Sequence, residues 1–83
     1  MFNVNEFKED CIRDLERIGI VAEVDLKKVP KTKLYRMIVI SEQFSRIGYQ
    51  EEQKICWRVV DKNLSSADQL HILSIDSRIS NDA

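Results

Sequence analysis

The stretches YRMIVISEQF (residues 35–44) and LHILSI (residues 70–75) decide the fold of this chain. Each contains a short apolar run of the kind that forms buried strands. A helical pattern lies between them, and a strand, a crossover helix and a strand most often form a right-handed parallel unit. We therefore expect residues 34–40 to form a central strand and residues 70–75 to form a parallel strand beside it.

Two helices are predicted, because apolar residues recur at helical spacing before and after the first of these strands. The stripe of the first helix consists of Val4, Phe7, Cys11, Leu15 and Ile18, and charged residues, Asp14 among them, are expected largely on its other, solvated side. The stripe of the second consists of Ile55, Cys56, Val59, Val60 and Leu64, with Trp57 at its edge. Asn3 and Glu6 resemble a capping box and Gly19 supplies a helix-ending turn, so the first helix should span about residues 4–18. The second helix should span about residues 50–64.

Ile20, Ala22, Val24 and Leu26 alternate with charged residues, which predicts an edge strand with one buried face. Residues 27–33 contain Pro30 and should form a hairpin turn, and Ser41 should cap a short turn through Phe44. The predicted fold class is α+β with the order α-β-β-α-β, a three-stranded mixed sheet covered on one face by two helices. Ile38 and Val59 are expected in its core, the ordered part is expected at about residues 4–76, and residues 77–83 are expected to form a frayed polar tail.

The composition is that of one small domain. Eighty-three residues can enclose a single small core. The formal net charge of −1 gives no general attraction to nucleic acid or to anionic membranes. Neither a signal-peptide pattern nor a membrane-spanning run occurs, so a cytoplasmic location is expected. Cys11 and Cys56 lie on the apolar helix stripes, which favours reduced core thiols over a disulfide.

Three short motifs, in this order and spacing, resemble the BolA family of small adaptor proteins with a class II KH-like fold. They are Val39-Ile40-Ser41-Glu42-Gln43-Phe44, Ile55-Cys56-Trp57 and His71-Ile72-Leu73-Ser74-Ile75. The resemblance covers about residues 6–76. It implies a monothiol glutaredoxin as partner and a 2Fe–2S cluster shared with it, with His71 as a ligand and no cluster bound by the isolated chain.

This chain departs from the family pattern at two places. Glu52-Gln53-Lys54 stands where many members carry a basic run, so a positive helix face is largely missing. Members that share a cluster are understood to supply a second ligand, a His or Cys, from the hairpin loop, whereas residues 25–34 contain neither. A cysteine introduced at Thr32 is expected to restore such a ligand if the loop reaches the iron.

Each candidate site has a structural alternative. His71 is either a cluster ligand or a histidine hydrogen-bonded at a strand end. Trp57 is either a partner anchor or a partly buried core residue. The basic hairpin either contacts phosphates or an acidic partner, or forms a solvated loop that guards an exposed strand against aggregation. This basic hairpin consists of Lys27, Lys28, Lys31, Lys33 and Arg36.

The sequence predicts a binding protein rather than an enzyme, because no nucleophile with its base, metal-ligand cluster or phosphate loop is recognisable. The favoured function is a BolA-like adaptor for iron–sulfur handling or iron sensing that is a monomer or a weak homodimer. A KH-like nucleic-acid-binding transcription regulator and a cluster-free interaction module are the alternatives. The hairpin lacks the GxxG loop with which KH domains clamp a nucleic-acid backbone, which argues against sequence-specific RNA binding.

Overall fold

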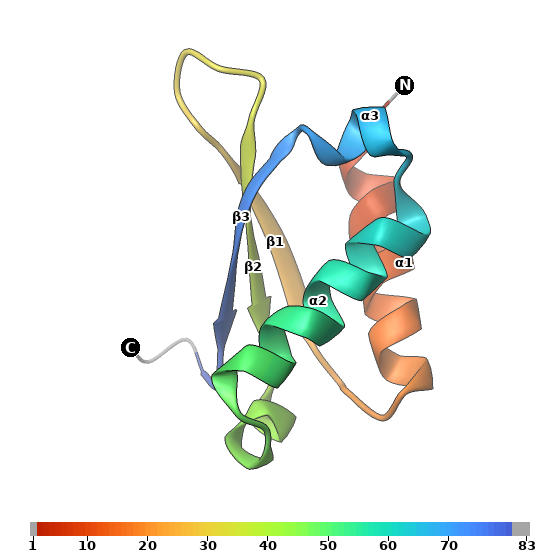
Figure 1. The fold of residues 1–83 in the computed structure, drawn as a ribbon, viewed down its shortest axis with the longest axis vertical. Coiled ribbons are helices and arrows are strands. Elements are labelled where there is room, and N and C mark those ends of the chain that lie inside the picture. The colour runs from red at the N-terminus through yellow and green to blue at the C-terminus, as the bar shows by residue number, and fades with distance from the viewer. Residues whose placement is uncertain (1, 81–83) are drawn as a thin grey trace.

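A computed structural model describes residues 2–80 of the chain and has the predicted α+β architecture (Figure 1). The elements are α1 (Val4–Arg17), β1 (Glu23–Lys28), β2 (Tyr35–Ile40), the 3-10 helix η1 (Glu42–Arg46), α2 (Tyr49–Asn63), α3 (Ser66–Gln69) and β3 (Ile72–Arg78). The order α-β-β-α-β is confirmed, with η1 and α3 as short additions. Among residues 2–80, no helix has both the length and the apolar character needed to cross a membrane.

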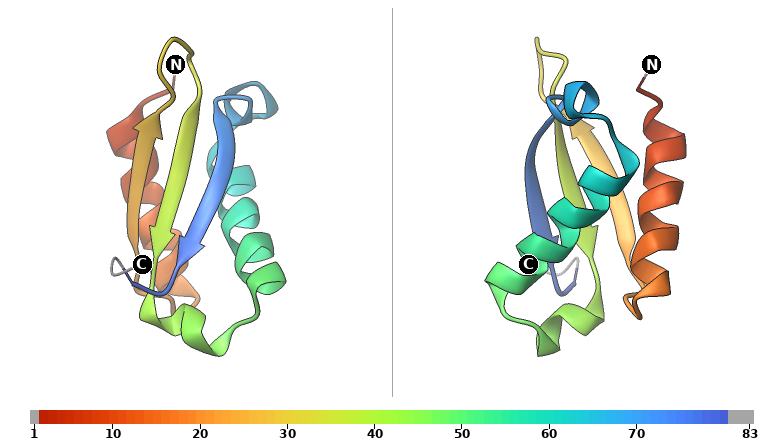
Figure 2. Two further views of the ribbon diagram at one scale, coloured as in Figure 1. Left: turned by 90° about the vertical axis from the view of Figure 1, so that its left-hand side faces the viewer. Right: turned by 45° about the vertical axis from the view of Figure 1, so that its right-hand side comes forward.

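The three strands form one sheet in the order β1-β2-β3. β1 and β2 are antiparallel, whereas β2 and β3 are parallel, so the sheet is mixed as predicted. β2 is the central strand and β1 lies at an edge, as its alternating pattern indicated. The left view of Figure 2 looks onto the helix-free face of the sheet, with α1 and α2 behind it.

The core lies between the helices and the opposite face of the sheet. Its buried members from α1 and α2 include Cys11, Leu15, Cys56, Val59 and Val60. In β2, Met37 and Val39 are fully buried, but Ile38 is only half-buried and is not part of the core cluster. The core prediction is therefore confirmed for Val59 and wrong for Ile38, because successive strand residues point to opposite faces and Ile38 belongs to the helix-free one.

The start of α1 is held by two local interactions. The Glu6 backbone N–H donates to Oδ1 of the Asn3 cap at 3.0 Å. The Phe2 ring, just before this cap, lies 5.5 Å from the Phe7 ring between centroids, which is the arrangement of a hydrophobic staple. At the other end Gly19 has the predicted left-handed conformation, with φ of 87°. Ile18 is the C-cap and is 59% exposed, so it does not extend the apolar stripe as expected.

The segment before β3 differs from the prediction. Ser65 caps α3 by accepting from the Asp68 backbone N–H at 3.2 Å, and Leu70 ends this short helix. β3 therefore begins at Ile72 rather than at residue 70, and it continues to Arg78, so residues 77 and 78 belong to the sheet and not to the expected tail. Residues 81–83 of that tail lie outside the described residues.

Helix α2 partly covers the outer edge of β3. The Gln53 side-chain amide donates to the Ile75 carbonyl at 3.0 Å. This bond occupies a backbone carbonyl with which a further strand would have to pair. Natural proteins protect sheet edges in this way. Trp57, one turn further along α2, is 37% exposed at the edge of the apolar arc.

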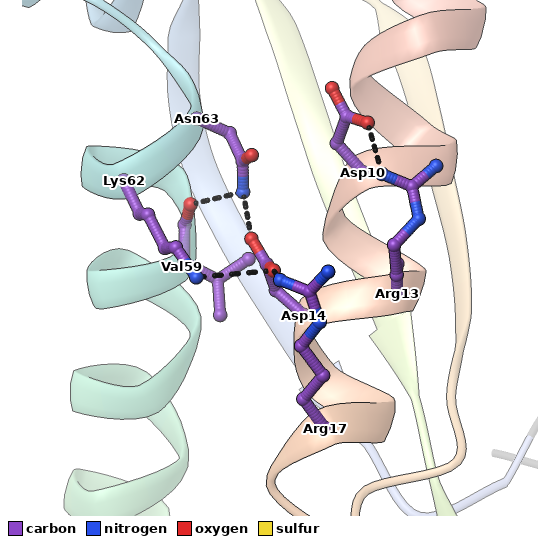
Figure 3. Close-up of polar contacts among 7 residues, drawn as sticks. All are labelled: Asp10, Arg13, Asp14, Arg17, Val59, Lys62 and Asn63. Atoms are coloured by element: carbon purple, nitrogen blue, oxygen red, sulfur yellow. Dashed lines mark hydrogen bonds and ion pairs between the residues drawn. The ribbon is translucent and has the colours of Figure 1, made fainter.

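Asp14 joins α1 to α2 through a polar network that the sequence pattern had placed on the solvent side of α1 (Figure 3). Its Oδ2 accepts from the Asn63 amide at 2.7 Å, while Oδ1 accepts from Lys62 at 3.3 Å and from Arg17 at 3.1 Å. The residue is only 8% exposed. The hydrogen bond from Asn63, followed by contact with Lys62, lowers the pKa of the Asp14 carboxyl below its ordinary value of 3.8 despite the opposing effect of burial.

Asp14→Asn should destabilise the fold by about 1–3 kcal/mol at pH 7, because the Asn63 amide and the Lys62 ammonium lose the charged, buried partner that joins them to α1. A carboxyl whose pKa is lowered by folding contributes stability above its unfolded-state pKa and loses this contribution as the pH falls through its folded-state pKa. The free energy of unfolding, measured by urea titration, should therefore fall more steeply below about pH 4 in the wild type than in Asp14→Asn.

Asp10→Asn is the matched control, because Asp10 pairs with Arg13 at the same spacing and distance as Asp14 with Arg17, but on the exposed surface (Figure 3). Its effect should stay below about 0.5 kcal/mol. Equal effects of the two substitutions would contradict the role of Asp14 in joining the helices.

Candidate functional site

His71 lies between α3 and β3, at the end of the sheet where the hairpin between β1 and β2 projects. Its backbone N–H donates to the Asp68 carbonyl at 3.0 Å, and its own carbonyl accepts from the Tyr35 N–H at 2.7 Å. These two bonds tie it to α3 on one side and to the central strand on the other. The backbone of His71 is therefore fixed just before β3, whereas the sequence had placed this residue inside the strand.

Two contacts orient the imidazole ring of His71. Its Nδ1 lies 3.1 Å from the Lys33 carbonyl oxygen, and its plane stacks on Phe2 with centroids 5.5 Å apart and an interplanar angle of 17°. Because a carbonyl oxygen only accepts, Nδ1 must carry the hydrogen of this bond. In the neutral ring the lone pair is then on Nε2, and a hydrogen bond at Nδ1 is what orients a histidine that binds a ligand through Nε2.

An open depression of about 390 Å³ surrounds this ring. It is lined by Phe2, Lys28, Lys33, Tyr35, Asp68 and His71. We call it the His71 depression. Lys28 pairs with Tyr35 across β1 and β2. Both residues project from the helix-covered face of the sheet, since they continue the alternation of Val24 and Met37.

The charges around the His71 depression are unequal. Two lysines, Lys28 and Lys33, line it together with one aspartate, Asp68. Asp68 also borders a neighbouring depression of about 190 Å³, whose lining includes the carboxylates of Glu6 and Asp10. A basic and an acidic hollow thus lie side by side at this end of the molecule, with Asp68 between them.

The five basic residues of the hairpin do not form the single patch that their sequence suggests. Lys28 and Lys33 line the His71 depression. Lys27 and Arg36 are paired across the strands and share the helix-free face. Lys31 lies in the loop with a left-handed φ of 65°. Within residues 2–80 none of the five forms an ion pair.

The hairpin contributes its backbone, and no His or Cys, to the surroundings of His71. The Thr32 hydroxyl donates to the Val29 carbonyl at 2.8 Å and accepts from the Leu34 N–H at 3.0 Å, so it holds the turn together. Thr32 does not line the depression, whereas Lys33 does. Lys33 is therefore a better position than Thr32 for a cysteine meant to complete a ligand set.

Cys11 and Cys56 are core residues, as predicted. Both are free cysteines with no exposed surface. Burial raises the pKa of each thiol to about 12, assisted at Cys11 by the charge of Asp14 and at Cys56 by the charge of Glu52. Because the thiolate is the form that attacks electrophiles or binds metals, these two thiols are poorly suited to either role.

In the part of the chain that the structure describes, His71 does not belong to a cluster of metal-ligating side chains. Among residues 2–80, no three His, Cys, Asp or Glu residues lie where they could together hold a metal ion. At this depression the described residues can contribute the Nε2 of His71 and the carboxylate of Asp68, and a further ligand would be water or a group of a partner.

Comparisons of the chain with known proteins do not assign a family. No family model, no curated protein and no solved structure matches it. The element order agrees with the predicted KH-like topology, while membership of the BolA family stays a prediction.

Three residues of the His71 depression, Phe2, Tyr35 and Asp68, were not among the site residues predicted from the sequence. Phe2 had a signal, because an apolar residue before a helix cap, with another at the fourth helical position, is the spacing of a hydrophobic staple. Asp68 also had one, since Ser65 followed three residues later by an acidic residue indicates a capped helix turn. The signal at Phe2 does not indicate that its ring meets His71, because this contact depends on how distant segments pack.

Proposed function

We propose that this protein is a non-enzymatic adaptor that binds a protein partner through the His71 end of its sheet. The observation that carries the proposal is the orientation of His71, whose Nδ1 contact with the Lys33 carbonyl leaves Nε2 for an external ligand at the rim of an open depression. The resemblance to the BolA family suggests a cytoplasmic monothiol glutaredoxin as the partner and a shared 2Fe–2S cluster as the cargo.

The residues present fit such a cluster in part. His71 supplies one imidazole of the kind that iron accepts. A cluster held by thiolates and glutathione is anionic, so Lys28 and Lys33 would complement its charge. The hairpin offers no second His or Cys. The remaining iron site would then be filled by the Asp68 carboxylate, by water or by the partner, and we expect a cluster more labile than one held by two nitrogen or sulfur ligands from the adaptor.

The test is to mix the purified protein with a monothiol glutaredoxin already loaded with its cluster. The expected result is a changed visible absorption and circular dichroism spectrum, together with a mixed complex on size-exclusion chromatography. Complex formation without a spectral change would favour the cluster-free interaction module. Neither a complex nor a spectral change would reject the glutaredoxin partner.

Nucleic-acid binding is the second candidate, supported by the five hairpin cations without ion-pair partners in the described part of the chain. Contacts between lysines and phosphates release counterions, so their affinity falls steeply with salt. The net charge of −1 and the absence of a Gly-rich clamp in the sequence favour weak, nonspecific binding at most. Tight, sequence-selective binding at physiological salt, abolished by changing Lys28, Lys31 and Lys33 to Glu, would reverse this ranking.

A further inference from the structure

We propose that the His71 depression is a binding site for a small organic anion, a phosphate or carboxylate group carried on a compact apolar body. This inference does not rest on the adaptor function, because it concerns the isolated chain without a partner or a cluster. It rests on three observations: the excess of positive charge, the oriented imidazole and the aromatic wall of the same hollow.

The charge balance selects an anion over a cation. Lys28 and Lys33 contribute two positive charges against the single negative charge of Asp68. Neither lysine forms an ion pair within residues 2–80. A metal cation would be repelled by these ammonium groups and would find at most two protein ligands, whereas an oxyanion gains from both charges.

The His71 ring adds a directional contact to this charge. Its Nδ1 is occupied by the Lys33 carbonyl and its face by Phe2, so Nε2 is the ring atom left for a ligand. Nε2 can therefore form a hydrogen bond with a bound ligand or with a water that the ligand holds. The ring is therefore already oriented for contact with a ligand in the free protein, which reduces the entropy cost of ordering this side chain on binding.

The size and the wall of the depression indicate that the ligand is more than a bare ion. Its volume of about 390 Å³ falls within the range of small-molecule sites. Water occupies roughly 30 Å³ per molecule in the liquid, so this hollow is several times larger than an inorganic oxyanion requires. Phe2 and Tyr35, whose ring centroids are 5.6 Å apart, provide an apolar surface on which a small ring or chain can pack.

The experiment is a titration of the isolated 83-residue chain, monitored by NMR of the backbone amides and of the His71 ring nitrogens. Phenyl phosphate, benzoate, inorganic phosphate and benzyl alcohol serve as probes at constant ionic strength. We expect phenyl phosphate or benzoate to shift the amides of Lys33, Tyr35 and His71 together with Nε2, and their relative affinities distinguish a phosphate site from a carboxylate site. Inorganic phosphate should bind at least about fivefold more weakly, and benzyl alcohol should give no saturable shift.

Lysine variants test the location of the site. Lys28→Ala and Lys33→Ala should each weaken binding of the better probe by about fivefold or more, since each removes one charge next to the ligand. Lys31→Ala is the matched control, because Lys31 belongs to the same hairpin but does not line the depression. Its effect should stay below about twofold.

Asp68→Asn tests the sign of the charge, and its expected effect is opposite to that of the lysine variants. Removing the one carboxylate should tighten binding of the anion a few-fold, while the backbone bond from His71 to the Asp68 carbonyl is kept. A bound cation would instead be weakened by this change.

Four results would overturn the proposal. They are the absence of saturable shifts with either aryl anion, equal losses in Lys31→Ala and Lys33→Ala, weaker anion binding in Asp68→Asn, and inorganic phosphate binding as tightly as both aryl anions. None of these results depends on a glutaredoxin, so a failure of the anion site and a failure of the adaptor function are distinguishable.

Discussion

Phe44→Ala should lower the free energy of unfolding by about 3–5 kcal/mol, the largest stability effect that we expect from a single substitution in this chain. Phe44 is the largest fully buried side chain and is 1% exposed. It belongs to η1, which closes the end of the core where the chain passes from β2 to α2 (Figure 1). Neighbouring residues cannot move in to fill the cavity that loss of the ring would leave, because Ser41 fixes the backbone just before η1. Its hydroxyl donates to the Val21 carbonyl at 2.9 Å.

The measurement is a urea titration with a thermal melt followed by circular dichroism. For a domain of this size each kcal/mol corresponds to about 4–8 °C, so the midpoint should fall by more than about 10 °C. Tyr49→Ala is the control, because Tyr49 is also aromatic and lies only five residues later but is 64% exposed. It should change the stability by less than about 0.5 kcal/mol. Comparable losses in both variants, or a loss below about 1 kcal/mol in Phe44→Ala, would contradict this packing of η1.

The sequence predicted the elements whose hydrophobic period is unambiguous. The spacing of Cys11 and Leu15 correctly indicated which side of α1 is buried, and the spacing of Cys56 and Val60 did so for α2. Both helices begin and end within a residue of the expected positions. A continuous apolar run carries no such period, and the sequence therefore indicated a central strand at residues 34–40 without telling that Met37 faces the core and Ile38 the helix-free side.

Polar residues that act over long distances were the other source of error. Asp14 was placed with the solvated side of α1, because its partner Asn63 is 49 positions away and no local pattern links them. The start of β3 was misplaced for a local reason, since the capped turn of α3 occupies Ser66–Gln69 and delays the strand. At the candidate site, the residue type alone singled out His71, but its ring contacts with Phe2 and with the Lys33 carbonyl depend on three distant segments meeting.

His71→Ala should abolish the spectral change on mixing with a cluster-loaded monothiol glutaredoxin, which is the largest functional effect that the adaptor proposal predicts. The variant loses the stack on Phe2 and the hydrogen bond to Lys33, an effect of about 1–2 kcal/mol on stability. The ring contributes no part of the buried core, so the fold should persist. Far-ultraviolet circular dichroism of the variant alone would verify this before the mixing experiment.

His71→Phe separates ligation from packing. Phenylalanine can keep the stack on Phe2 but has no ring nitrogen, so a loss of the spectral change in this variant assigns the effect to the imidazole. Complex formation without the cluster should be retained if the rest of the surface contacts the partner. An unchanged cluster spectrum and affinity in His71→Phe would reject the ligand role and leave the cluster-free interaction module as the better account.

An added cysteine tests whether the hairpin side of the depression faces the same iron. Lys33→Cys, at the residue whose carbonyl contacts the His71 ring, should slow loss of the cluster several-fold, measured as the decay of visible absorbance in the mixed complex. Thr32→Cys is the matched control, because the Thr32 hydroxyl is committed to the turn and the residue does not line the depression. A thiolate can replace an oxygen ligand only where the chain reaches the metal. Stabilisation of the cluster by Thr32→Cys but not by Lys33→Cys would therefore contradict the inference that the Lys33 side of the depression faces the iron.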